Sequence, residues 1–358
     1  MVRIPCKGGP VPGKENIMKK KLLALSMAAL MACLALAGCG SSSDQSSESA
    51  DNADKTKVTF VLDWTPNTNH TGVYVAQEKG FFDEAGLEVE IVQPPDDGAE
   101  AMVAAGKAQF GVSFQDYLVP AVAGETKTMP ITAVAAILQH NLSGIMSAKG
   151  NGITSPKGLE GKKYATWELP IEQAILKDCV EKDGGDFSKV EMIPQTIDDE
   201  VAALKAKQVD AIWVYYGWAG INAEVKDFPI DYFAFKDIEP AFDYYSPVII
   251  ANDDFLANDP DTAKAFMEAV SKGYEYTVEH PDEAADILIA ANPEIDADLV
   301  RASQKYLTDQ YTAEASQWGI IDADRWNAFY DFINKEGLAE AEIPENVGFS
   351  NDYLPAAK

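Results

Sequence analysis

Four stretches of the sequence place aromatic and polar side chains directly beside a predicted strand. The first, LDWTPNTNHTGVYVAQEKGFF (62–82), ends a strand at Asp63 and Trp64, passes through a Pro- and Asn-rich loop, and reaches His70 at a helix start. Ligands of α/β sheets bind beyond the carboxyl ends of strands, where a helix N-terminus also offers unpaired N–H groups. The loop is therefore well placed to line a pocket. Its residues could instead serve the fold, Trp64 as a core ring and His70 as a hydrogen-bonding group.

The second stretch, TWELPIEQAIL (166–176), ends a strand at Trp167 and Glu168 and carries Glu172 in the first turn of the next helix. An acidic side chain at that position is often only a partner of the helix dipole. Glu172 alone is therefore a weak indication of a site.

The third and fourth stretches, AIWVYYGWAGI (211–221) and AFDYYSPVIIAND (241–253), gather more rings beside a strand than a core needs. They supply Trp213, Tyr215, Tyr216, Trp218, Asp243, Tyr244 and Tyr245. Together the four stretches predict a cleft lined by flat rings with a few carboxylates and amides. Such a cleft suits a planar, polar, nitrogen-bearing molecule.

The elements that must position these stretches alternate between short apolar strands and helical segments, which favours an α/β fold with mainly parallel sheets. Because about 290 folded residues exceed what one core usually holds, we expect two lobes. Strands are predicted at 58–63, 89–93, 109–114, 131–138, 162–167, 210–216 and 246–252. Helices are predicted at 71–79, 98–105, 170–182, 198–206 and 260–280, followed by a mostly helical remainder to 337.

The composition and charge exclude some partners. The 358 residues are 47% hydrophobic, 24% charged and 10% aromatic, which is typical of a folded globular protein. With 29 Lys and Arg against 57 Asp and Glu, the chain is strongly acidic. Nucleic acid and an anionic lipid surface are disfavoured, because both require a clustered basic face.

Residues 1–38 are predicted to be a signal peptide rather than part of the fold. Met18 is followed by three lysines, an apolar run over 22–37 and a Leu-Ala-Gly-Cys tetrad that ends at Cys39. The run is shorter than the roughly 20 apolar residues of a membrane-spanning helix. The tetrad resembles the lipobox of bacterial lipoproteins, whose cysteine is acylated; an ordinary signal peptide is the alternative. Residues 1–17 contain no apolar segment and precede Met18, so we interpret them as the result of a start codon assigned too far upstream.

Removal of residues 1–38 would leave 23 basic against 56 acidic residues, with Cys39 and Cys179 as the two cysteines. An intramolecular disulfide framework and a cysteine-based metal site are therefore excluded. The stretch GSSSDQSSESADNAD (40–54) has nothing to bury, so residues 39–55 are predicted to be a disordered tether behind a lipid anchor.

The four stretches, the unit that ends in QFGVSF, and QWGIIDADRWNAFYDFI near the end of the chain resemble, in this order, the substrate-binding proteins of the NMT1/THI5-like family. The likeness is greatest to members that serve ABC transporters of thiamine pyrimidine precursors, and it covers roughly residues 56–345. It implies a type II periplasmic-binding-protein fold, in which two α/β lobes close on the ligand by hinge motion. We expect lobe one at 56–143 and 247–345, lobe two at 144–246, and crossovers near 141–147 and 244–247.

The ligand that this resemblance implies is a 4-amino-2-methylpyrimidine with a 5-formylaminomethyl or 5-hydroxymethyl group. Trp64 and either Tyr244 or Tyr245 would stack on the ring, and Glu172 would accept from its exocyclic amine. Polar edges from lobe one would be Asn67, His70 and Tyr74, and the far wall in lobe two would be Trp213, Tyr215 and Tyr216.

The resemblance also implies a monomeric, non-catalytic capture protein without cofactor or metal. It would be anchored by lipid on the outer face of the cell membrane and would dock on an ABC permease with its ATPase. A riboflavin-binding protein is the alternative, because an aromatic cleft also suits an isoalloxazine ring. A sulfonate would need Arg, Lys or several N–H donors, and the four stretches contain no Arg.

An enzyme is the least favoured alternative. Pyrimidine synthases of the same fold consume one of their own histidines together with pyridoxal phosphate, which would make His70 the donor by position. Those synthases carry a cysteine-rich CCCFC-type motif, whereas the region from 172 to 216 here has Cys179 alone.

Overall fold

The computed structural model describes residues 55–124 and 128–356. The predicted signal peptide at 1–38, the predicted lipidation site at Cys39 and the tether as far as residue 54 lie outside the described residues. In the part of the chain that is described, no helix combines the length and the apolar character needed to cross a membrane.

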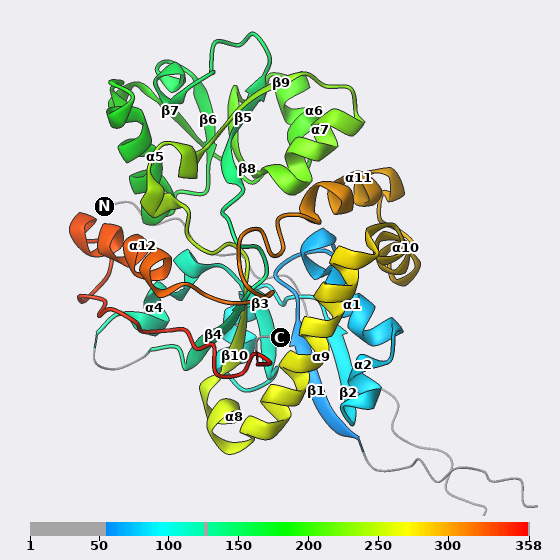
Figure 1. The fold of residues 1–358 in the computed structure, drawn as a ribbon. Coiled ribbons are helices and arrows are strands. Elements are labelled where there is room, and N and C mark those ends of the chain that lie inside the picture. Colours follow the sequence, from blue (N-terminus) through cyan, green and yellow to red (C-terminus); the bar gives the residue numbers. More distant parts are fainter. Residues whose placement is uncertain (1–54, 125–127, 357–358) are drawn as a thin grey trace, which may run out of the picture. The chain divides into compact units, whose positions relative to one another are not determined.

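The first lobe is built on a five-stranded sheet (Figure 1). Its strands are β1 (Thr56–Val61), β2 (Leu87–Val92), β3 (Phe110–Ser113), β4 (Ile131–Ala136) and β10 (Val248–Asn252), in the order β2-β1-β3-β10-β4. β1 is parallel to β2 and β3, whereas β10 is antiparallel to β3 and β4. The central strands β3 and β10 are buried throughout because helices cover both faces of the sheet.

Helices of the first lobe come from both ends of the chain. They are α1 (Thr71–Glu78), α2 (Phe81–Glu84), α3 (Gly98–Ala104), α4 (Val119–Val122), α8 (Asp253–Asn258), α9 (Pro260–Glu279), α10 (Pro281–Ala291), α11 (Ala297–Leu307) and α12 (Ala323–Glu336). The short 3₁₀ helices η1 (Thr68–His70) and η2 (Gln115–Leu118) follow the ends of β1 and β3.

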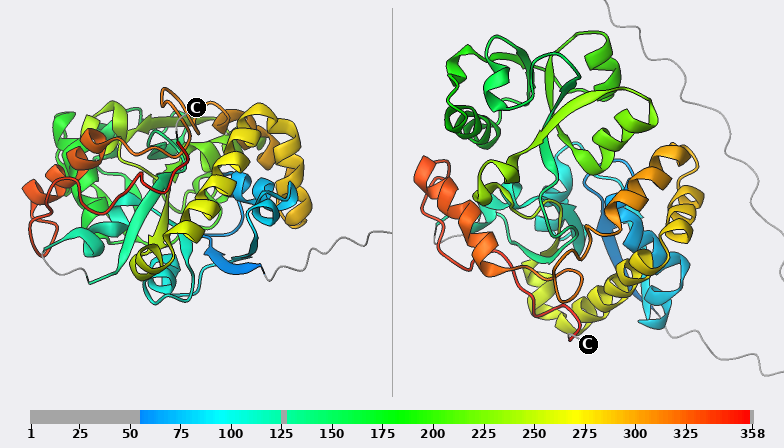
Figure 2. Two further views of the ribbon diagram at one scale, coloured as in Figure 1. Left: turned by 60° about the horizontal axis from the view of Figure 1, so that its bottom comes forward. Right: turned by 45° about the horizontal axis from the view of Figure 1, so that its top comes forward.

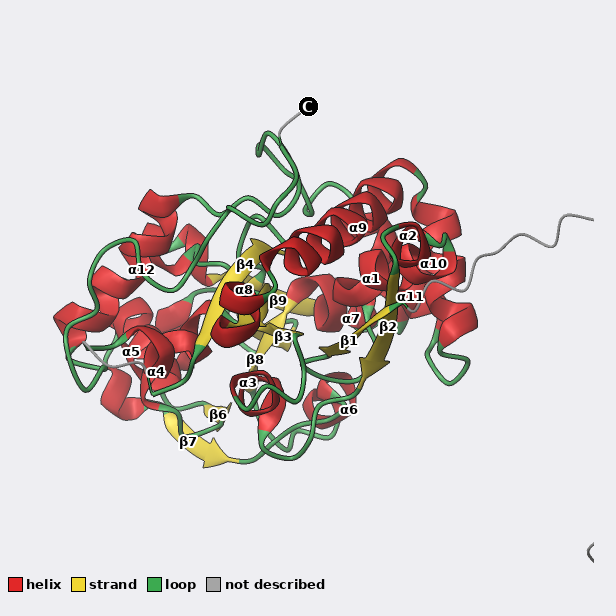
Figure 3. Ribbon diagram, turned by 90° about the horizontal axis from the view of Figure 1, so that it is seen from below, coloured by secondary structure: helices red, strands yellow, loops and turns green. Residues whose placement is uncertain are grey.

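One face of this sheet is covered by α9, which lies beside α1 and α2 in Figure 3. The ring of Phe266 on α9 stacks on Phe110 of β3 with centroids 4.1 Å apart. Where α9 meets α1, a Cβ atom on Gly273 would lie 2.0 Å from the carbonyl oxygen of Gly72. The close contact between the two helices therefore requires glycine at position 273.

The second lobe carries another five-stranded sheet, in the order β7-β6-β8-β5-β9, and is green in the right view of Figure 2. Its strands are β5 (Ser143–Ala148), β6 (Lys163–Thr166), β7 (Glu191–Pro194), β8 (Ala211–Tyr215) and β9 (Ile230–Ala234). Its helices are α5 (Pro170–Lys182), α6 (Glu200–Lys205), α7 (Ile221–Val225), the π-helical turn η5 (Tyr216–Gly220), and the 3₁₀ helices η3 (Pro156–Leu159), η4 (Phe187–Lys189), η6 (Phe235–Asp237) and η7 (Pro240–Phe242).

The two-lobe α/β architecture predicted from the sequence is confirmed. Each sheet is mainly parallel, as predicted, because four of its five strands run in one direction, and one strand runs the opposite way. In each sheet the strand by which the chain enters from the other lobe, β5 or β10, is antiparallel to both of its neighbours. A strand that arrives without a crossover helix can run in this opposite direction. Three strands, β5, β7 and β9, were absent from the predicted set. The exact lobe boundaries given above stay a prediction.

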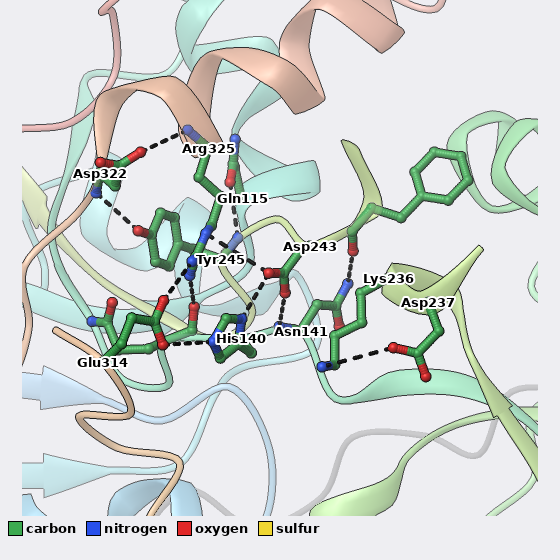
Figure 4. Close-up of polar contacts among 12 residues, drawn as sticks. Gln115, His140, Asn141, Lys236, Asp237, Asp243, Tyr245, Glu314, Asp322 and Arg325 are labelled. Atoms are coloured by element: carbon green, nitrogen blue, oxygen red, sulfur yellow. Dashed lines mark hydrogen bonds and ion pairs between the residues drawn. The ribbon is translucent and has the colours of Figure 1, made fainter. Parts of the chain in front are cut away.

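Charged and amide side chains tie the two crossing segments, 137–142 and 235–247, to each other (Figure 4). His140 Nδ1 lies 2.7 Å from Asp243 Oδ2, and the backbone N–H of Asn141 donates to Asp243 Oδ1 at 3.0 Å. From the first lobe, Glu314 Oε2 lies 2.8 Å from His140 Nε2, and Arg325 donates to Glu314 at 2.9 Å. Both crossing segments are therefore held by the part of the first lobe that follows α11.

Candidate functional site

Strands of both sheets end in aromatic side chains that the fold leaves exposed. Trp64 follows β1 and is 46% exposed, Tyr117 follows β3 and is 44% exposed, and Trp167 follows β6 and is 40% exposed. Large rings are normally buried. Three exposed rings that follow strand ends therefore indicate a binding surface. We call Trp64, Tyr117 and Trp167 the aromatic rim.

The strand ends of the two lobes meet beside this rim. Phe114, just after β3, stacks on Tyr215 at the end of β8, with centroids 5.6 Å apart and planes 19° from parallel. Trp167 lies 5.9 Å from Trp213 of β8, ring to ring. Although the Tyr117 ring is partly exposed, loss of hydration is the first cause that raises its pKa; the charges of Asp116 and Glu100, then of Glu172 in lobe two and Asp63 in lobe one, raise it further. The carboxyl ends of both sheets therefore border one region.

The loop after β1 is held in place by a buried histidine. His70 Nε2 lies 2.6 Å from Asp63 Oδ1, and the backbone N–H of Asn67 donates to His70 Nδ1 at 3.1 Å. Since Nδ1 accepts this bond, the ring carries its proton on Nε2 and donates it to Asp63. The Asn67 side chain caps η1 by accepting from the backbone N–H of Asn69. Asn67 and His70 thus shape the loop that presents Trp64.

Asp116 is the carboxylate of lobe one with an unused acceptor. Its Oδ1 is shielded from solvent and has no hydrogen-bond partner among the described residues. Loss of hydration, and after it the negative charge of Glu100, raises the pKa of Asp116 to about 7. Glu100 itself accepts a 2.5 Å hydrogen bond from Ser113, and burial raises its pKa as well. An unpaired carboxyl oxygen of this kind is costly unless a ligand uses it.

Two buried polar atoms of lobe two also lack a hydrogen bond within the described residues, Ser143 Oγ and Trp213 Nε1. Ser246 and Tyr244, by contrast, have hydrogen-bond partners in Tyr215 and Asn141. Ser143 pairs with Tyr215 across β5 and β8, so these two side chains share one face of the sheet. Tyr215 is directed at Ser246, and Asp116 and Tyr215 both help to raise the pKa of Tyr244 above its usual range, after burial. These side chains therefore lie near one another where the two lobes meet.

We call this set the inter-lobe cluster. It consists of Asp63, Trp64, Phe114, Asp116, Tyr117, Ser143, Trp167, Trp213, Tyr215, Tyr244 and Ser246. It combines flat rings with hydroxyl and indole donors and with carboxylates. Among the described residues, no group of three or more His, Cys, Asp or Glu side chains is placed to hold a metal ion.

Two of the predicted tyrosines lie elsewhere. Tyr74 packs in a small apolar cluster with Leu288 and Val300, and its hydroxyl lies 3.4 Å from Asn292. Tyr216 donates to Glu224 at 2.5 Å and packs against other rings of η5, β9 and α11. The structure does not bring these two residues to the inter-lobe cluster.

Tyr245 and Glu172 make structural contacts. Tyr245 Oη accepts from the backbone N–H of Asp322 at 2.8 Å, and its ring lies below Arg325. Glu172 is buried, and its two oxygens accept from Tyr164, Thr166 and the backbone N–H groups of 167 and 169. Its carboxylate thereby fixes the loop of Trp167. Of the two tyrosines predicted as stacking partners, Tyr244 is the one beside Asp116.

The sequence interpretation missed Phe114, Asp116, Tyr117, Ser143 and Ser246. A signal was present, because FQDYL directly follows the strand QFGVS. A strand end that carries two rings and a carboxylate meets the same criterion that selected Asp63 and Trp64.

Comparison with known proteins agrees with this geometry. The family model described as NMT1/THI5 like matches residues 67–284, which is more than half of the chain. The chain belongs to the NMT1/THI5-like family. The NMT1/THI5-like match begins within the loop that presents Trp64 and ends in α10.

Relatives of this NMT1/THI5-like protein include both binding proteins and synthases. It is 28% identical to the formylaminopyrimidine-binding protein of Halalkalibacterium halodurans, over 90% of this chain and 96% of the relative. It is 26% identical to a 4-amino-5-hydroxymethyl-2-methylpyrimidine phosphate synthase of Saccharomyces cerevisiae, over 83% and 88%. The alkanesulfonate-binding protein of Xanthomonas axonopodis pv. citri superposes with a TM-score of 0.62 at 11% identity, over 83% and 99%. The last comparison shows the periplasmic-binding-protein fold.

Proposed function

We propose that this NMT1/THI5-like protein is the extracytoplasmic solute-binding component of an ABC importer and captures a thiamine pyrimidine precursor. The ligand would be a 4-amino-2-methylpyrimidine with a substituted 5-methylene group. One observation carries the proposal: exposed rings from both lobes border buried donors and a carboxyl oxygen that have no partners. A flat heterocycle with an exocyclic amine and ring nitrogens complements both features.

Each part of the ligand has a counterpart in the inter-lobe cluster. The rings of Trp64 and Tyr117 offer faces for stacking, and Trp167 offers another from the second lobe. Asp116 Oδ1 would accept from the exocyclic amine, and Trp213 Nε1 would donate to a ring nitrogen. Glu172 would contribute its negative charge to the site and would hold the loop that presents Trp167. Tyr215 and Tyr244 would form the wall.

A capture role is favoured over a synthase role by the state of His70. Its ring is fully buried, and both ring nitrogens are engaged by Asp63 and the Asn67 backbone. A histidine that is consumed as a substrate would have to leave this pocket. Cys179, which is the one cysteine of the described residues, is buried on α5 and is not placed at the inter-lobe cluster.

The proposal places the protein outside the cytoplasmic membrane. The likeness to a formylaminopyrimidine-binding protein and to periplasmic binding proteins supports export and docking on a permease with its ATPase. Acylation at Cys39 would provide the anchor, and mass spectrometry of the protein from a lipoprotein-processing bacterial host would detect it.

Calorimetric titration of the full chain tests the ligand. We expect a saturable heat with the formylaminomethyl or the hydroxymethyl aminopyrimidine and none with riboflavin. Binding of riboflavin alone would keep the capture role and replace the ligand. If circular dichroism shows a folded protein, the absence of binding heat with all three compounds would contradict the proposed function. Incubation with pyridoxal phosphate, followed by intact-mass measurement, tests the synthase role, which requires loss of mass at His70.

A further inference from the structure

Helix α11 of the first lobe packs against η5 and α7 of the second lobe (Figure 1). The Tyr306 ring of α11 lies 5.4 Å from the Tyr216 ring of η5, centroid to centroid. A Cβ atom on Gly217 would lie 2.7 Å from Leu307 Cδ2, so glycine allows η5 to approach α11 closely. Because η5 directly follows β8, which carries Tyr215 of the inter-lobe cluster, this contact joins the lobes next to the candidate site.

A buried hydroxyl group of α11 connects three elements at this contact. Ser303 donates to the carbonyl oxygen of Gly217 in η5. Its Oγ also lies 2.6 Å from Oγ1 of Thr68, which belongs to η1 and follows the loop that presents Trp64. Since the one hydroxyl proton of Ser303 goes to Gly217, the Thr68 hydroxyl must be the donor to Ser303. The three groups therefore form a hydroxyl chain that runs from η1, through α11, to the second lobe.

The start of the hydroxyl chain is held firmly within the first lobe. Tyr311 donates to the backbone carbonyl oxygen of Thr68 at 2.7 Å, and the Thr71 hydroxyl donates to the same oxygen at 3.0 Å. Ser303 and Thr68 are 0% and 1% exposed. A buried hydroxyl or carbonyl group that loses its partner cannot replace it with water, and linked hydrogen bonds strengthen one another. Separation of η5 from η1 is therefore unfavourable.

We propose that Ser303 is a positioning residue of the binding site, which fixes the loop of Trp64 against the second lobe while a ligand lies between the lobes. The inference deepens the proposed function and rests on it for the identity of the ligand, whereas the hydroxyl chain is defined by the protein alone. The chain opposes the separation of the lobes that must precede ligand release. Its loss should therefore speed release more than it slows binding.

Surface plasmon resonance of the formylaminomethyl aminopyrimidine on the immobilised full chain tests the inference. Ser303→Ala should raise the dissociation rate constant roughly three- to tenfold and leave the association rate constant nearly unchanged. Ser147→Ala is the matched control, because Ser147 is also 0% exposed and donates to a backbone carbonyl, that of Ile153, within its own lobe. Unchanged release in Ser303→Ala, or an equal change in Ser147→Ala, would overturn the inference. Circular dichroism confirms that both variants are folded.

Hydrogen exchange of the ligand-free full chain tests the hydroxyl chain separately from the proposed function. Thr68→Val keeps the shape of the side chain and removes the first donor. We expect faster exchange at 216–220 in the other lobe, and no additional effect of Thr68→Val once Ser303→Ala is present. Faster exchange confined to 68–70 would overturn the inference. Failure of the original protein to bind any aminopyrimidine would overturn the proposed function alone, because the exchange measurement requires no ligand.

Discussion

Phe114 of the first lobe stacks on Tyr215 of the second, with their ring centroids 5.6 Å apart. The two residues end the strands β3 and β8, one in each sheet. The stack therefore joins the strand ends beside the unpartnered atoms of Ser143 and Asp116. It is a direct aromatic contact between the two lobes.

Phe114→Leu should weaken ligand binding with little loss of fold stability. An aromatic pair contributes about 0.5–1.5 kcal/mol beyond burial, so we expect a roughly three- to tenfold loss of affinity. Phe82→Leu is the contrasting variant, since Phe82 stacks on Phe266 inside the first lobe, 5.4 Å away. That variant should lower the melting temperature and leave affinity unchanged. Titration and thermal unfolding of both variants separate the two effects; a loss of stability without loss of affinity in Phe114→Leu would contradict the prediction.

The ligand-free Asp116→Asn variant should be more stable than the original protein at pH 8, and its gain in stability should be smaller at pH 5. The folded-state pKa of Asp116, about 7, lies above the value of 3.8 for an unperturbed carboxyl. The folded state therefore binds more protons between these two values, so Asp116 lowers stability progressively as the pH rises from 3.8 to about 7 and by a constant amount above that. We expect a gain on the order of 2 kcal/mol at pH 8. Urea unfolding at both pH values measures it.

Asp183→Asn should change the stability in the opposite direction from Asp116→Asn. Asp183 accepts from the Ser155 hydroxyl and the Lys157 backbone N–H, which lower its pKa in that order. Its contribution to stability is present at neutral pH and is lost as the pH falls through the folded-state pKa. The variant should therefore be less stable than the original protein at pH 7. Urea unfolding at pH 7 measures the difference, and a gain of stability in Asp183→Asn at that pH would contradict the prediction.

Two tryptophan substitutions should separate binding from folding. Trp64 is 46% exposed, so Trp64→Ala should change the free energy of unfolding by less than about 0.5 kcal/mol while reducing affinity roughly tenfold. Trp318 is 1% exposed, stacks on Tyr274 at 4.1 Å and donates to the carbonyl of Ile137. Trp318→Ala should cost about 3–5 kcal/mol of stability. The prediction fails if Trp64→Ala binds the ligand as well as the original protein does.

His140→Ala should destabilise the protein more at pH 5.5 than at pH 9. The hydrogen bond to Asp243, first among its causes, raises the pKa of His140 above the ordinary value of 6.5. The resulting stabilisation is fully present below that ordinary value and is lost as the pH rises through the folded-state pKa. Because His140 is partly exposed, we expect less than about 1 kcal/mol. Guanidinium unfolding across this pH range checks it, and an equal loss at both pH values would argue that the contact acts only through packing.

Much of the fold could be predicted from local patterns. The helix at Pro170–Lys182 was predicted with the same bounds, because Pro170 and Glu172 are strong first-turn signals. The strand SGIMSA (Ser143–Ala148) was missed, because its Ser and Gly residues weaken an apolar pattern that tertiary burial completes. Its antiparallel direction depends on the route of the chain between lobes, and no local pattern encodes that route.

The residues of the candidate site could likewise be predicted only in part from the sequence. Asp63 and Trp64 could be found because they end a clear strand, and the structure places them at a strand end. Glu172 was expected to face the ligand, but its partners Tyr164 and Thr166 lie on a strand whose distance from α5 is set by packing. Asp116 was overlooked because an aspartate in a short helix usually faces solvent, and the residues whose pKa values it raises, Tyr215 and Tyr244, lie far along the chain.

The aromatic rim has an optical consequence. Of the six tryptophans in the chain, Trp64 and Trp167 are the exposed ones, Trp218 is half-buried, and Trp213, Trp318 and Trp326 are buried. A flat ligand that stacks on the rim displaces water from the two indoles whose emission is most sensitive to it. The intrinsic fluorescence of the unlabelled protein should therefore shift to shorter wavelength in proportion to occupancy, so that the molecule serves as its own reporter of the ligand it holds.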